Sequence, residues 1–438
     1  MSFMSFYTKI CVLLWSRTAY DELCKCCSGV SYSNPLSKEW VPPPPGWLKF
    51  NVDGAVREDV AGFGLVLRDS KGEIKAVFFL HFTGCQSRDS KIVVMDAAET
   101  SKPRLVSLTE DADKSPDDEL LQLVQTLPKE QGWAVSNLYL YQGFWCTAHF
   151  LKPLISFQRH FRAFDSDVIV ATFPKCGTTW LKALVFSTLY RNQFARDDDN
   201  PLLSFTPHQL VRFLEHDLYL NNPCPDLENI CAYKPRLFAT HVPYASLPAS
   251  IKDSNCKIVY LCRNPMDVFV SLWLFTDKLR EENQEPLSLD EVLDKFCRGI
   301  YIHGPFFDQV LGYWKASRED PDKILFLKYE DLKEDIGSQL KHLAVFLGVP
   351  FTEEEDKQGV VEEIAEICSF EKLQELEVNK KGLFITGVPN KDFFRKGEVG
   401  DWRNYLTSAM VERLEKLIQE KLDNSGLTFK LSYTASDA

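Results

Sequence analysis

The segment TFPKCGTTW combines residue types that bind a phosphate-like anion. An apolar run of strand length, residues 167–173, leads into it, and apolar residues at helical spacing follow it. The turn between them therefore lies at a helix N-terminus, where unpaired N–H groups and the helix dipole favour an anion. Gly177 lets the backbone approach the anion closely, Thr178 and Thr179 supply hydroxyl donors, and Lys175 supplies a mobile positive charge. These residues predict an anion site between a strand and a helix.

Two other interpretations of this turn stay open from its residues alone. The turn lacks the G-x-x-x-x-G-K-S/T order of the nucleoside-triphosphate loop, because Lys175 precedes its glycine. A nucleotide kinase nevertheless stays an alternative, since its strand–loop–helix is physically similar. The second alternative is a capped structural loop that binds no ligand.

A second strand–turn–helix is predicted in CKIVYLCRNPMDVFVSLW. Residues 257–262 form an apolar run of strand length, Asn264 is suited to cap a helix, and Pro265 suits the first helical position. Arg263 then lies at the C-terminal end of the strand, and Ser271 lies about two turns into the helix. Because ligands collect at the carboxyl ends of strands in open α/β sheets, we expect both side chains near the anion.

Two further segments carry groups suited to anion binding and to proton transfer. In FFRKGEVGDW, Arg395 and Lys396 offer a guanidinium fork and an ammonium, and Gly397 offers an unhindered backbone N–H. Taken alone, such a charge run is usually a solvated face. His241 ends an apolar run in PRLFATHVPYASLP and should lie at the mouth of the sheet. A neutral imidazole there can accept a proton near pH 7, although a lone histidine is more often structural.

Together these motifs resemble the soluble sulfotransferases, which use 3′-phosphoadenosine 5′-phosphosulfate (PAPS) as co-substrate. TFPKCGTTW resembles their 5′-phosphosulfate loop, the segments that contain Arg263 and Arg395 follow in the family's order, and QGFWCTAHFLKPLISFQRHF resembles the plant branch. The resemblance extends from about Leu120 to the C-terminus. It implies a three-layer α/β fold with a central parallel sheet in a cytoplasmic enzyme of plant secondary metabolism. The implied reaction is transfer of a sulfuryl group to a hydroxyl or similar group of a small molecule.

The resemblance also implies roles for individual residues. Lys175 and His241 match catalytic residues, with His241 as the general base, and Arg263 and Ser271 match residues that bind the 3′-phosphate. The remaining matches are cofactor-binding residues, a group that again includes the phosphosulfate-loop lysine: Lys175, Cys176, Gly177, Thr178, Thr179, Trp180, Tyr329, Phe370, Arg395, Lys396 and Gly397. Cys176 stands where many members have serine, and Ala239 stands where some animal members have a lysine. No metal is expected in the site.

The sequence before the sulfotransferase-like part divides into three segments. Residues 1–45 form an unassigned segment and a linker that reads WVPPPPG at its end. Residues 46–94 predict three strands, and PPPPGWLKFNVDGA and GFGLVLRDSKGE resemble the opening of ribonuclease-H-like domains of plant retroelement-derived proteins. Asp53 matches a metal-binding carboxylate of that family, but the other carboxylates are missing, which implies an inactive fragment. Residues 95–119 predict a flexible acidic linker, and residues 120–438 the sulfotransferase domain.

Composition limits the remaining function classes. The 438 residues carry a formal net charge of −12, which argues against a nucleic-acid-binding protein centred on residues 46–94. No stretch approaches the roughly 20 apolar residues of a membrane span. The thirteen cysteines are an odd number and lie in apolar runs, which indicates a reduced compartment. We therefore expect a small-molecule acceptor as the partner, and flavonols, steroids, hydroxyjasmonates and desulfoglucosinolates all stay open.

Overall fold

The computed structural model describes residues 49–57, 60–68, 74–83, 95–97, 116–133, 137–194, 200–280 and 285–430. The chain divides into two compact units, Met1–Asp111 and Ala112–Ala438, and each is described by itself. For the first unit, the structure describes the backbone of the strands.

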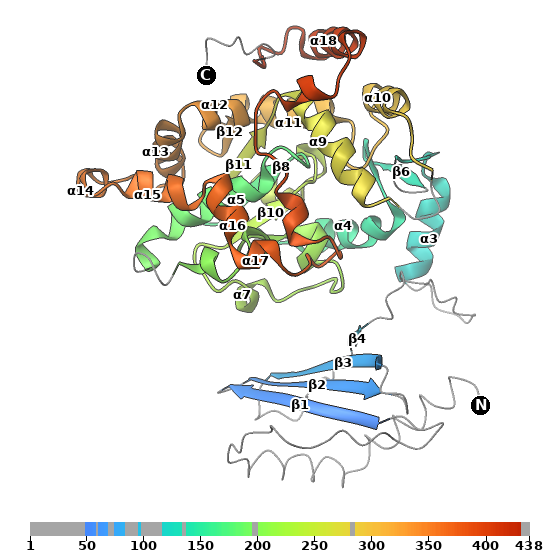
Figure 1. Cartoon of the computed structure of the whole chain (residues 1–438), viewed down its shortest axis with the longest axis vertical. Helices are drawn as coiled ribbons and strands as arrows, with labels where there is room; N and C mark the ends of the chain where they lie inside the picture. The colour runs from blue at the N-terminus through green and yellow to red at the C-terminus, as the bar shows by residue number, and fades with distance from the viewer. Residues whose placement is uncertain are drawn as a thin grey trace. The chain divides into compact units, whose positions relative to one another are not determined.

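The described part of the first unit is an antiparallel sheet with the strand order β1-β2-β3-β4 (Figure 1). Its strands are β1 (Lys49–Arg57), β2 (Val60–Arg68), β3 (Ile74–Thr83) and β4 (Met95–Ala97). The three strands predicted in residues 46–94 are present. Since β4 pairs with β3, the sheet continues into the segment that was predicted as a linker.

The second unit is built on a five-stranded parallel sheet with the order β12-β11-β8-β10-β9. These strands are β8 (Val168–Thr172), β9 (Arg212–Phe213), β10 (Leu237–Thr240), β11 (Lys257–Cys262) and β12 (Ile324–Lys328). A small antiparallel sheet accompanies it, made of β5 (Lys129–Glu130), β6 (Leu138–Tyr141) and β7 (Phe144–Cys146). The strands predicted from the two apolar runs are confirmed as β8 and β11.

Both faces of the parallel sheet are buried. Along β8, Ile169 and Ala171 belong to one hydrophobic cluster, whereas Val168 and Val170 belong to another. Because alternate side chains of a strand point to opposite faces, the two clusters lie on opposite sides of the sheet. Two-sided burial explains why this strand reads as a continuous apolar run. The predicted three-layer α/β fold with a central parallel sheet is confirmed.

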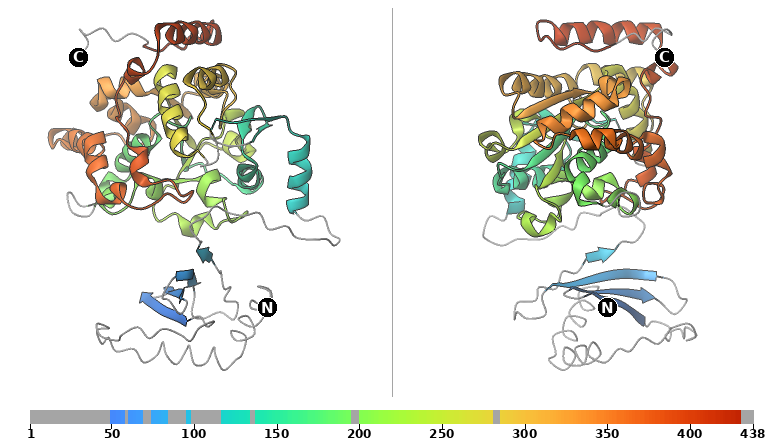
Figure 2. Two further views of the ribbon diagram at one scale, coloured as in Figure 1. Left: turned by 45° about the vertical axis from the view of Figure 1, so that its right-hand side comes forward. Right: turned by 90° about the vertical axis from the view of Figure 1, so that its left-hand side faces the viewer.

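Helices cover the two faces (Figures 1 and 2). One cluster takes side chains from α4, α9, α10, α11 and α18, and the other from α5, α12, α13, α15 and α16. The helices are α3 (Pro116–Thr126), α4 (Ala148–His160), α5 (Thr178–Tyr190), α6 (Pro207–Leu210), α7 (Leu227–Ile230), α8 (Ala249–Asp253), α9 (Pro265–Lys278), α10 (Leu289–Cys297), α11 (Phe306–Glu319), α12 (Tyr329–Glu334), α13 (Ile336–Phe346), α14 (Glu353–Lys357), α15 (Val360–Ile367), α16 (Phe370–Glu375), α17 (Glu377–Lys380) and α18 (Ser408–Leu422). Within the described ranges, no helix combines the length and the apolar character that a membrane span requires.

Local sequence fixes where the two helices nearest the predicted site begin. Gly177 precedes α5 with a left-handed φ of 97°, a conformation that glycine adopts readily. Before α9, the Asn264 side chain accepts a hydrogen bond from the Met266 N–H, and Pro265 occupies the first helical position. The predicted cap of the second strand–turn–helix is therefore confirmed, and both helix starts lie at the carboxyl ends of sheet strands.

Candidate active site

A cavity of about 450 Å³, the central cavity, opens at the carboxyl ends of the sheet strands. Lys175 follows β8, His241 follows β10, Arg263 follows β11 and Tyr329 follows β12, and all four residues line it. All the predicted site residues except Cys176 line this cavity: Lys175, Gly177, Thr178, Thr179, Trp180, His241, Arg263, Ser271, Tyr329, Phe370, Arg395, Lys396 and Gly397. Residues that lie far apart in the sequence therefore meet in one place.

The turn after β8 presents hydrogen-bond donors to the central cavity. Lys175 and Gly177 both have left-handed backbone conformations, with φ values of 69° and 97°. A Cβ atom on Gly177 would lie 2.8 Å from the Tyr329 ring, so this position requires glycine. Thr178 and Thr179 are the first two residues of α5, where backbone N–H groups lack helical partners. The turn thus offers backbone donors, two hydroxyls and a lysine to an anion.

The electrostatics of Lys175 agree with an anion site. Its Nζ lies 3.8 Å from the ring centroid of Phe275. Burial, followed by the charges of Arg395 and Arg263, lowers the pKa of Lys175 to about 7. The three cations repel one another, and an anion placed among them would raise this pKa.

Arg263 and Ser271 lie beside the turn, with side chains largely withdrawn from solvent. The Arg263 Nη2 donates to the backbone oxygen of Glu398 and lies 3.7 Å from Asp267 Oδ2. Its guanidinium carbon lies 4.5 Å from the ring centroid of Tyr329, and Arg263 Nε is buried without a hydrogen-bond partner among the described residues. Since buried N–H groups are usually paired, this one is suited to a ligand oxygen.

A carboxylate holds the two cations of the RKG segment in place. The Arg395 Nη1 lies 2.5 Å from Asp401 Oδ2, and the Lys396 Nζ lies 2.5 Å from Asp401 Oδ1. Burial would raise the pKa of Asp401, but the hydrogen bonds from Lys396 and Arg395 bring it down to about 2, so this carboxyl is ionised. A Cβ atom on Gly397 would lie 2.5 Å from the Phe370 ring. The two cations are therefore positioned before any ligand binds.

Aromatic side chains line the cavity next to these cations. The rings of Trp180 and Tyr329 meet edge to face, with centroids 5.2 Å apart. The Tyr329 hydroxyl donates to the Gly397 carbonyl oxygen at 2.8 Å. The Trp180 Nε1 is buried, and no hydrogen-bond acceptor reaches it in the part of the chain that the structure describes. Flat apolar walls beside fixed cations suit a phosphorylated nucleotide.

His241 presents a neutral imidazole to the cavity in a defined tautomer. Its Nδ1 lies 2.8 Å from the backbone carbonyl oxygen of Thr172. Because a carbonyl oxygen only accepts, Nδ1 carries the ring proton and Nε2 keeps the lone pair. Burial, followed by the neighbouring His303, lowers the pKa of His241 well below its ordinary value. The imidazole can therefore accept a proton at Nε2.

The backbone of His241 is held from both sides. Its N–H donates to Glu215 Oε1 at 2.6 Å, and its carbonyl oxygen accepts from Gln309 Nε2 at 2.9 Å. The Thr172 hydroxyl lies 2.7 Å from the Thr178 hydroxyl at the start of α5. We call Lys175, Gly177, Thr178 and Thr179 the anion turn. Thr172, at the end of β8, therefore contacts both the imidazole and the anion turn.

Comparison with known proteins decides the family. The family model described as the sulfotransferase domain matches residues 165–426, which is more than half of the chain. The chain belongs to the sulfotransferase family. Cytosolic sulfotransferase 15 of Arabidopsis thaliana is 49% identical over 332 residues, which cover 74% of this chain and 92% of the relative. Cytosolic sulfotransferase 14 of the same plant is 50% identical over 319 residues, which cover 72% of this chain and 91% of the relative.

Solved structures agree with this assignment. A sulphotransferase of Arabidopsis thaliana is 40% identical, and the match covers 74% of this chain and 100% of that chain with a TM-score of 0.58. A retinol dehydratase is 24% identical, with 72% and 97% of the two chains covered and a TM-score of 0.55, and it shares the fold. The protein is thus an enzyme of the plant cytosolic sulfotransferase family, and the kinase alternative no longer applies.

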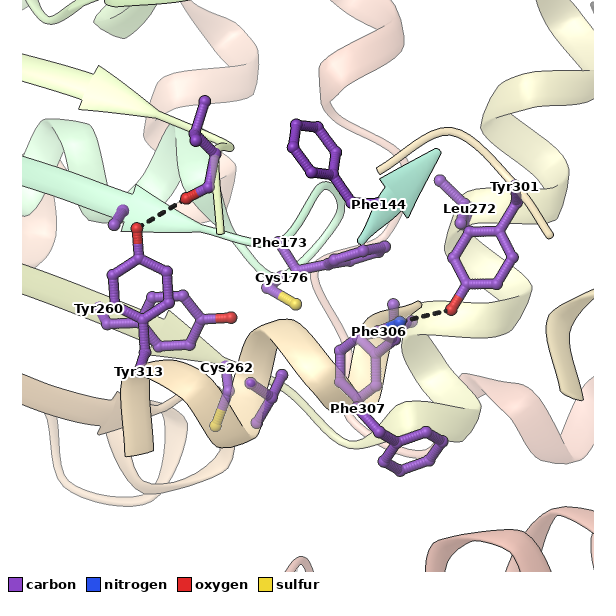
Figure 3. Close-up of a cluster of buried hydrophobic side chains, with 14 of the residues drawn as sticks. Phe144, Phe173, Cys176, Tyr260, Cys262, Leu272, Tyr301, Phe306, Phe307 and Tyr313 are labelled. Atoms are coloured by element: carbon purple, nitrogen blue, oxygen red, sulfur yellow. Dashed lines mark hydrogen bonds between the residues drawn. The ribbon is translucent and has the colours of Figure 1, made fainter. Parts of the chain in front are cut away.

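One predicted residue of the sulfotransferase site lies elsewhere. The Cys176 side chain is fully buried in the hydrophobic cluster that contains Phe173 and Tyr260 (Figure 3). Burial raises the pKa of its thiol far above the ordinary value, and its backbone N–H donates to the Phe173 carbonyl oxygen at 3.3 Å. The uncharged thiol behaves as a small hydrophobe and packs in the core, so a contact between Cys176 and the cofactor stays a prediction for its backbone alone.

Three further histidines, for which the sequence predicted no role, line the sulfotransferase cavity near His241. The Nε2 atoms of His216 and His303 lie 3.2 Å apart, and the two ring centroids lie 5.7 and 5.5 Å from that of His241. The third, His208, is buried beside Thr179. For two of these histidines the sequence held a signal, because polar residues lie inside apolar segments. His216 follows Glu215 in FLEHDLYL, and His303 lies in IYIHGP.

Proposed function

We propose that the central cavity transfers the sulfuryl group of PAPS to a hydroxyl or similar group of a small-molecule acceptor, with His241 as the general base. The observation that carries the proposal is a neutral imidazole with its Nε2 lone pair available, in the same cavity as the donor-rich start of α5. Membership of the sulfotransferase family supports the reaction class. The family relatives are named cytosolic, and we assign this protein to the cytosol as well.

The residues of the cavity fit PAPS as the co-substrate. The turn formed by Lys175, Gly177, Thr178 and Thr179 suits the 5′-phosphosulfate, since it combines helix N–H groups with a lysine. The Nε atoms of Arg263 and Arg395 are buried and have no hydrogen-bond partner among the described residues, which supports binding of the 3′-phosphate. We call the following residues the nucleotide end of the cavity: Lys175, Gly177, Thr178, Thr179, Trp180, Arg263, Ser271, Tyr329, Phe370, Arg395, Lys396 and Gly397.

PAPS supplies the sulfuryl group when bound, and the chain's own residues do the rest. The acceptor's oxygen forms the new bond to sulfur as the bond between sulfur and the phosphate oxygen of PAPS breaks, and PAP leaves with that bond's electron pair. His241 takes the proton of the acceptor's hydroxyl at Nε2. Lys175 and the N–H groups at the start of α5 face the phosphate oxygen on which negative charge develops, and they stabilise it. Thr172 holds the Nδ1 proton of His241, so the base keeps the correct tautomer during the transfer.

The other part of the cavity suits an uncharged acceptor. Phe213 contacts the rings of His241, His216 and His208, with centroid distances of 4.6, 5.6 and 5.7 Å. Together with Phe384 and His303, which also line the cavity, these residues form what we call the acceptor end. Its side chains are aromatic rings and neutral imidazoles, because burial lowers the pKa of each histidine. A small molecule with an apolar body and a hydroxyl group fits this lining.

For residues 46–94 we propose a partial ribonuclease-H-like domain without nuclease activity. The antiparallel order of β1, β2 and β3 supports this, and Asp53 lies on β1 opposite Gly64. Incubation of the full chain with an RNA–DNA hybrid and Mg²⁺ tests the proposal, and we expect no cleavage above a buffer control. Metal-dependent cleavage of the hybrid would contradict it.

An acceptor screen tests the central proposal. The full chain is incubated with sulfur-labelled PAPS and a panel of flavonols, steroids, hydroxyjasmonates and desulfoglucosinolates. We expect transfer of label to at least one of these hydroxylated compounds, without any need for ATP. A matched reaction with phosphorus-labelled ATP and Mg²⁺ is the control, and transfer of phosphate in place of sulfate would contradict the proposal.

A further inference from the structure

The proposed function leaves a fully buried lysine on α5 without a role. Lys182 lies one helical turn beyond the anion turn, and its side chain is excluded from solvent. Its Nζ lies 3.3 Å from the ring centroid of Phe213 and 3.1 Å from Nδ1 of His208. Burial lowers the pKa of Lys182 well below its ordinary value, while Asp217 and Glu215 oppose the shift. Burying such a side chain is costly, so a specific contact must account for its place.

His208 connects this lysine to the anion turn. Its Nε2 lies 3.0 Å from the hydroxyl oxygen of Thr179, and its Nδ1 faces Lys182. The ring belongs to α6, which is capped by Thr206 and Gln209, and it packs against Phe393 with centroids 4.4 Å apart. His208 therefore has little freedom to turn away from Thr179.

The protons in the hydrogen bonds that link Thr179, His208 and Lys182 can be assigned in that order, starting from the bound anion. Thr179 lines the nucleotide end, where a hydroxyl must donate its only proton to a bound anion. The Thr179 oxygen then accepts its hydrogen bond from His208, so the Nε2 of His208 carries the ring proton. Burial lowers the pKa of His208 well below its ordinary value, so the ring holds one proton and Nδ1 must accept. Lys182 can supply that bond, because a lysine nitrogen carries N–H groups in either protonation state.

We propose that Lys182 and His208 are positioning residues that hold the Thr179 hydroxyl as a donor to the 5′-phosphosulfate. The proposal rests on the proposed function, in which the anion turn binds that group. Without the two residues, the Thr179 hydroxyl is free to turn its proton away from the cavity. Its lone pair would then face the anion and repel it.

Two nucleotides that differ by the 5′-phosphate alone test the proposal. Calorimetry on the full chain measures the affinity for adenosine 3′,5′-bisphosphate (PAP), which carries this phosphate, and for adenosine 3′-phosphate, which lacks it. We expect His208→Phe and Lys182→Met to weaken PAP binding about tenfold, as for a lost hydrogen bond to a charged group. Binding of adenosine 3′-phosphate should stay within about twofold of the parent chain, since it makes no contact with Thr179.

Two further variants separate positioning from general damage to the fold. His208→Gln places an amide N–H near the former Nε2 and should recover most of the PAP affinity. In a Thr179→Val background, His208→Phe should cause no additional loss, because the hydroxyl that it positions is already absent. The exposed His342 provides a matched control, and His342→Phe should change neither affinity.

The outcomes distinguish the positioning role from the proposed function. Equal losses for the two nucleotides in His208→Phe would overturn the positioning role, and so would an undiminished loss in the Thr179→Val background. In either case the parent chain still binds PAP, and the proposed function stands. If the parent chain does not bind PAP at all, the proposed function fails and the positioning role fails with it. If Lys182→Met does not fold, the His208 and Thr179 variants still test the positioning role.

Discussion

The nucleotide end and the acceptor end of the central cavity differ in charge. At the nucleotide end, Arg395 and Lys396 are fixed cations that one ionised carboxylate, Asp401, holds in position. At the acceptor end, burial lowers the pKa of each histidine, so that His241 and His303 are neutral imidazoles. An anion needs fixed positive charge, whereas proton transfer needs an unprotonated base. The fold supplies each in a different place.

The strand β8 joins the two ends. The Thr172 carbonyl oxygen accepts from His241 Nδ1 at 2.8 Å, and the Thr172 hydroxyl lies 2.7 Å from that of Thr178. A single residue at the carboxyl end of a strand therefore orients the base and supports the anion turn. The difference between the ends shows that the carboxyl ends of neighbouring strands can hold charged and neutral groups side by side.

The largest effect that we expect at the nucleotide end follows from Arg395→Ala. The change removes a partly buried guanidinium whose Nε has no hydrogen-bond partner among the described residues. PAPS binding should weaken about 10- to 100-fold, and the preference for PAPS over adenosine 5′-phosphosulfate should narrow, because the contact that we propose for Arg395 is to the 3′-phosphate. Calorimetry with both nucleotides measures this. Arg413→Ala, at an exposed arginine paired with Asp294, is the control, and an unchanged preference in Arg395→Ala would show that the clamp is misplaced.

A smaller effect is expected at the acceptor end, where Glu215 should make the free energy of unfolding depend on pH. Glu215 is fully buried behind His241, and burial raises the pKa of its carboxyl to about 7 from 4.5. Because the folded pKa is raised, the stability that Glu215 contributes is fully present below its unfolded pKa and is lost as pH rises through about 7. Relative to the parent chain, Glu215→Gln should therefore gain stability as pH rises from 5 to 8, by about 2–3 kcal/mol in the free energy of unfolding.

Thermal unfolding across this pH range measures the difference. Glu412→Gln, at an exposed position on α18, provides the matched control and should follow the parent chain at every pH. Parallel curves for Glu215→Gln and the parent chain would contradict the assignment of a raised pKa to this carboxyl.

The smallest effect is expected outside both ends. The nucleotide and acceptor ends lie within the unit Ala112–Ala438, so a chain that begins at Met95 should keep full turnover and the same thermal midpoint. It should also be at least as soluble, since it lacks β1, which pairs on one side alone among the described strands. Expression of both chains and comparison of turnover and melting measures this. A marked loss of either property in the shorter chain would show that the first unit supports the enzyme.

The sequence was informative where the signal is local. The apolar runs before Lys175 and Arg263 predicted two buried strands, and the cap at Asn264 predicted a helix start, because each depends on a few adjacent residues. The side of the turn on which Cys176 lies could not be predicted, since it depends on the packing of distant aromatic residues. Single histidines inside apolar segments were visible in the sequence, but their meeting in one cavity could not be predicted. His208, His216 and His303 lie in separate segments that tertiary packing alone brings together.

The most direct test of the account is His241→Ala, with turnover and PAP affinity measured on the same preparation. In the proposed mechanism His241 accepts a proton and makes no phosphate contact, so turnover should fall about 10²- to 10⁴-fold while the dissociation constant for PAP stays within about twofold. His342→Ala, at an exposed histidine, should change neither quantity. Turnover within tenfold of the parent chain on a weakly acidic alcohol, or a loss of PAP affinity as large as the loss of turnover, would contradict the assignment of His241 as the general base.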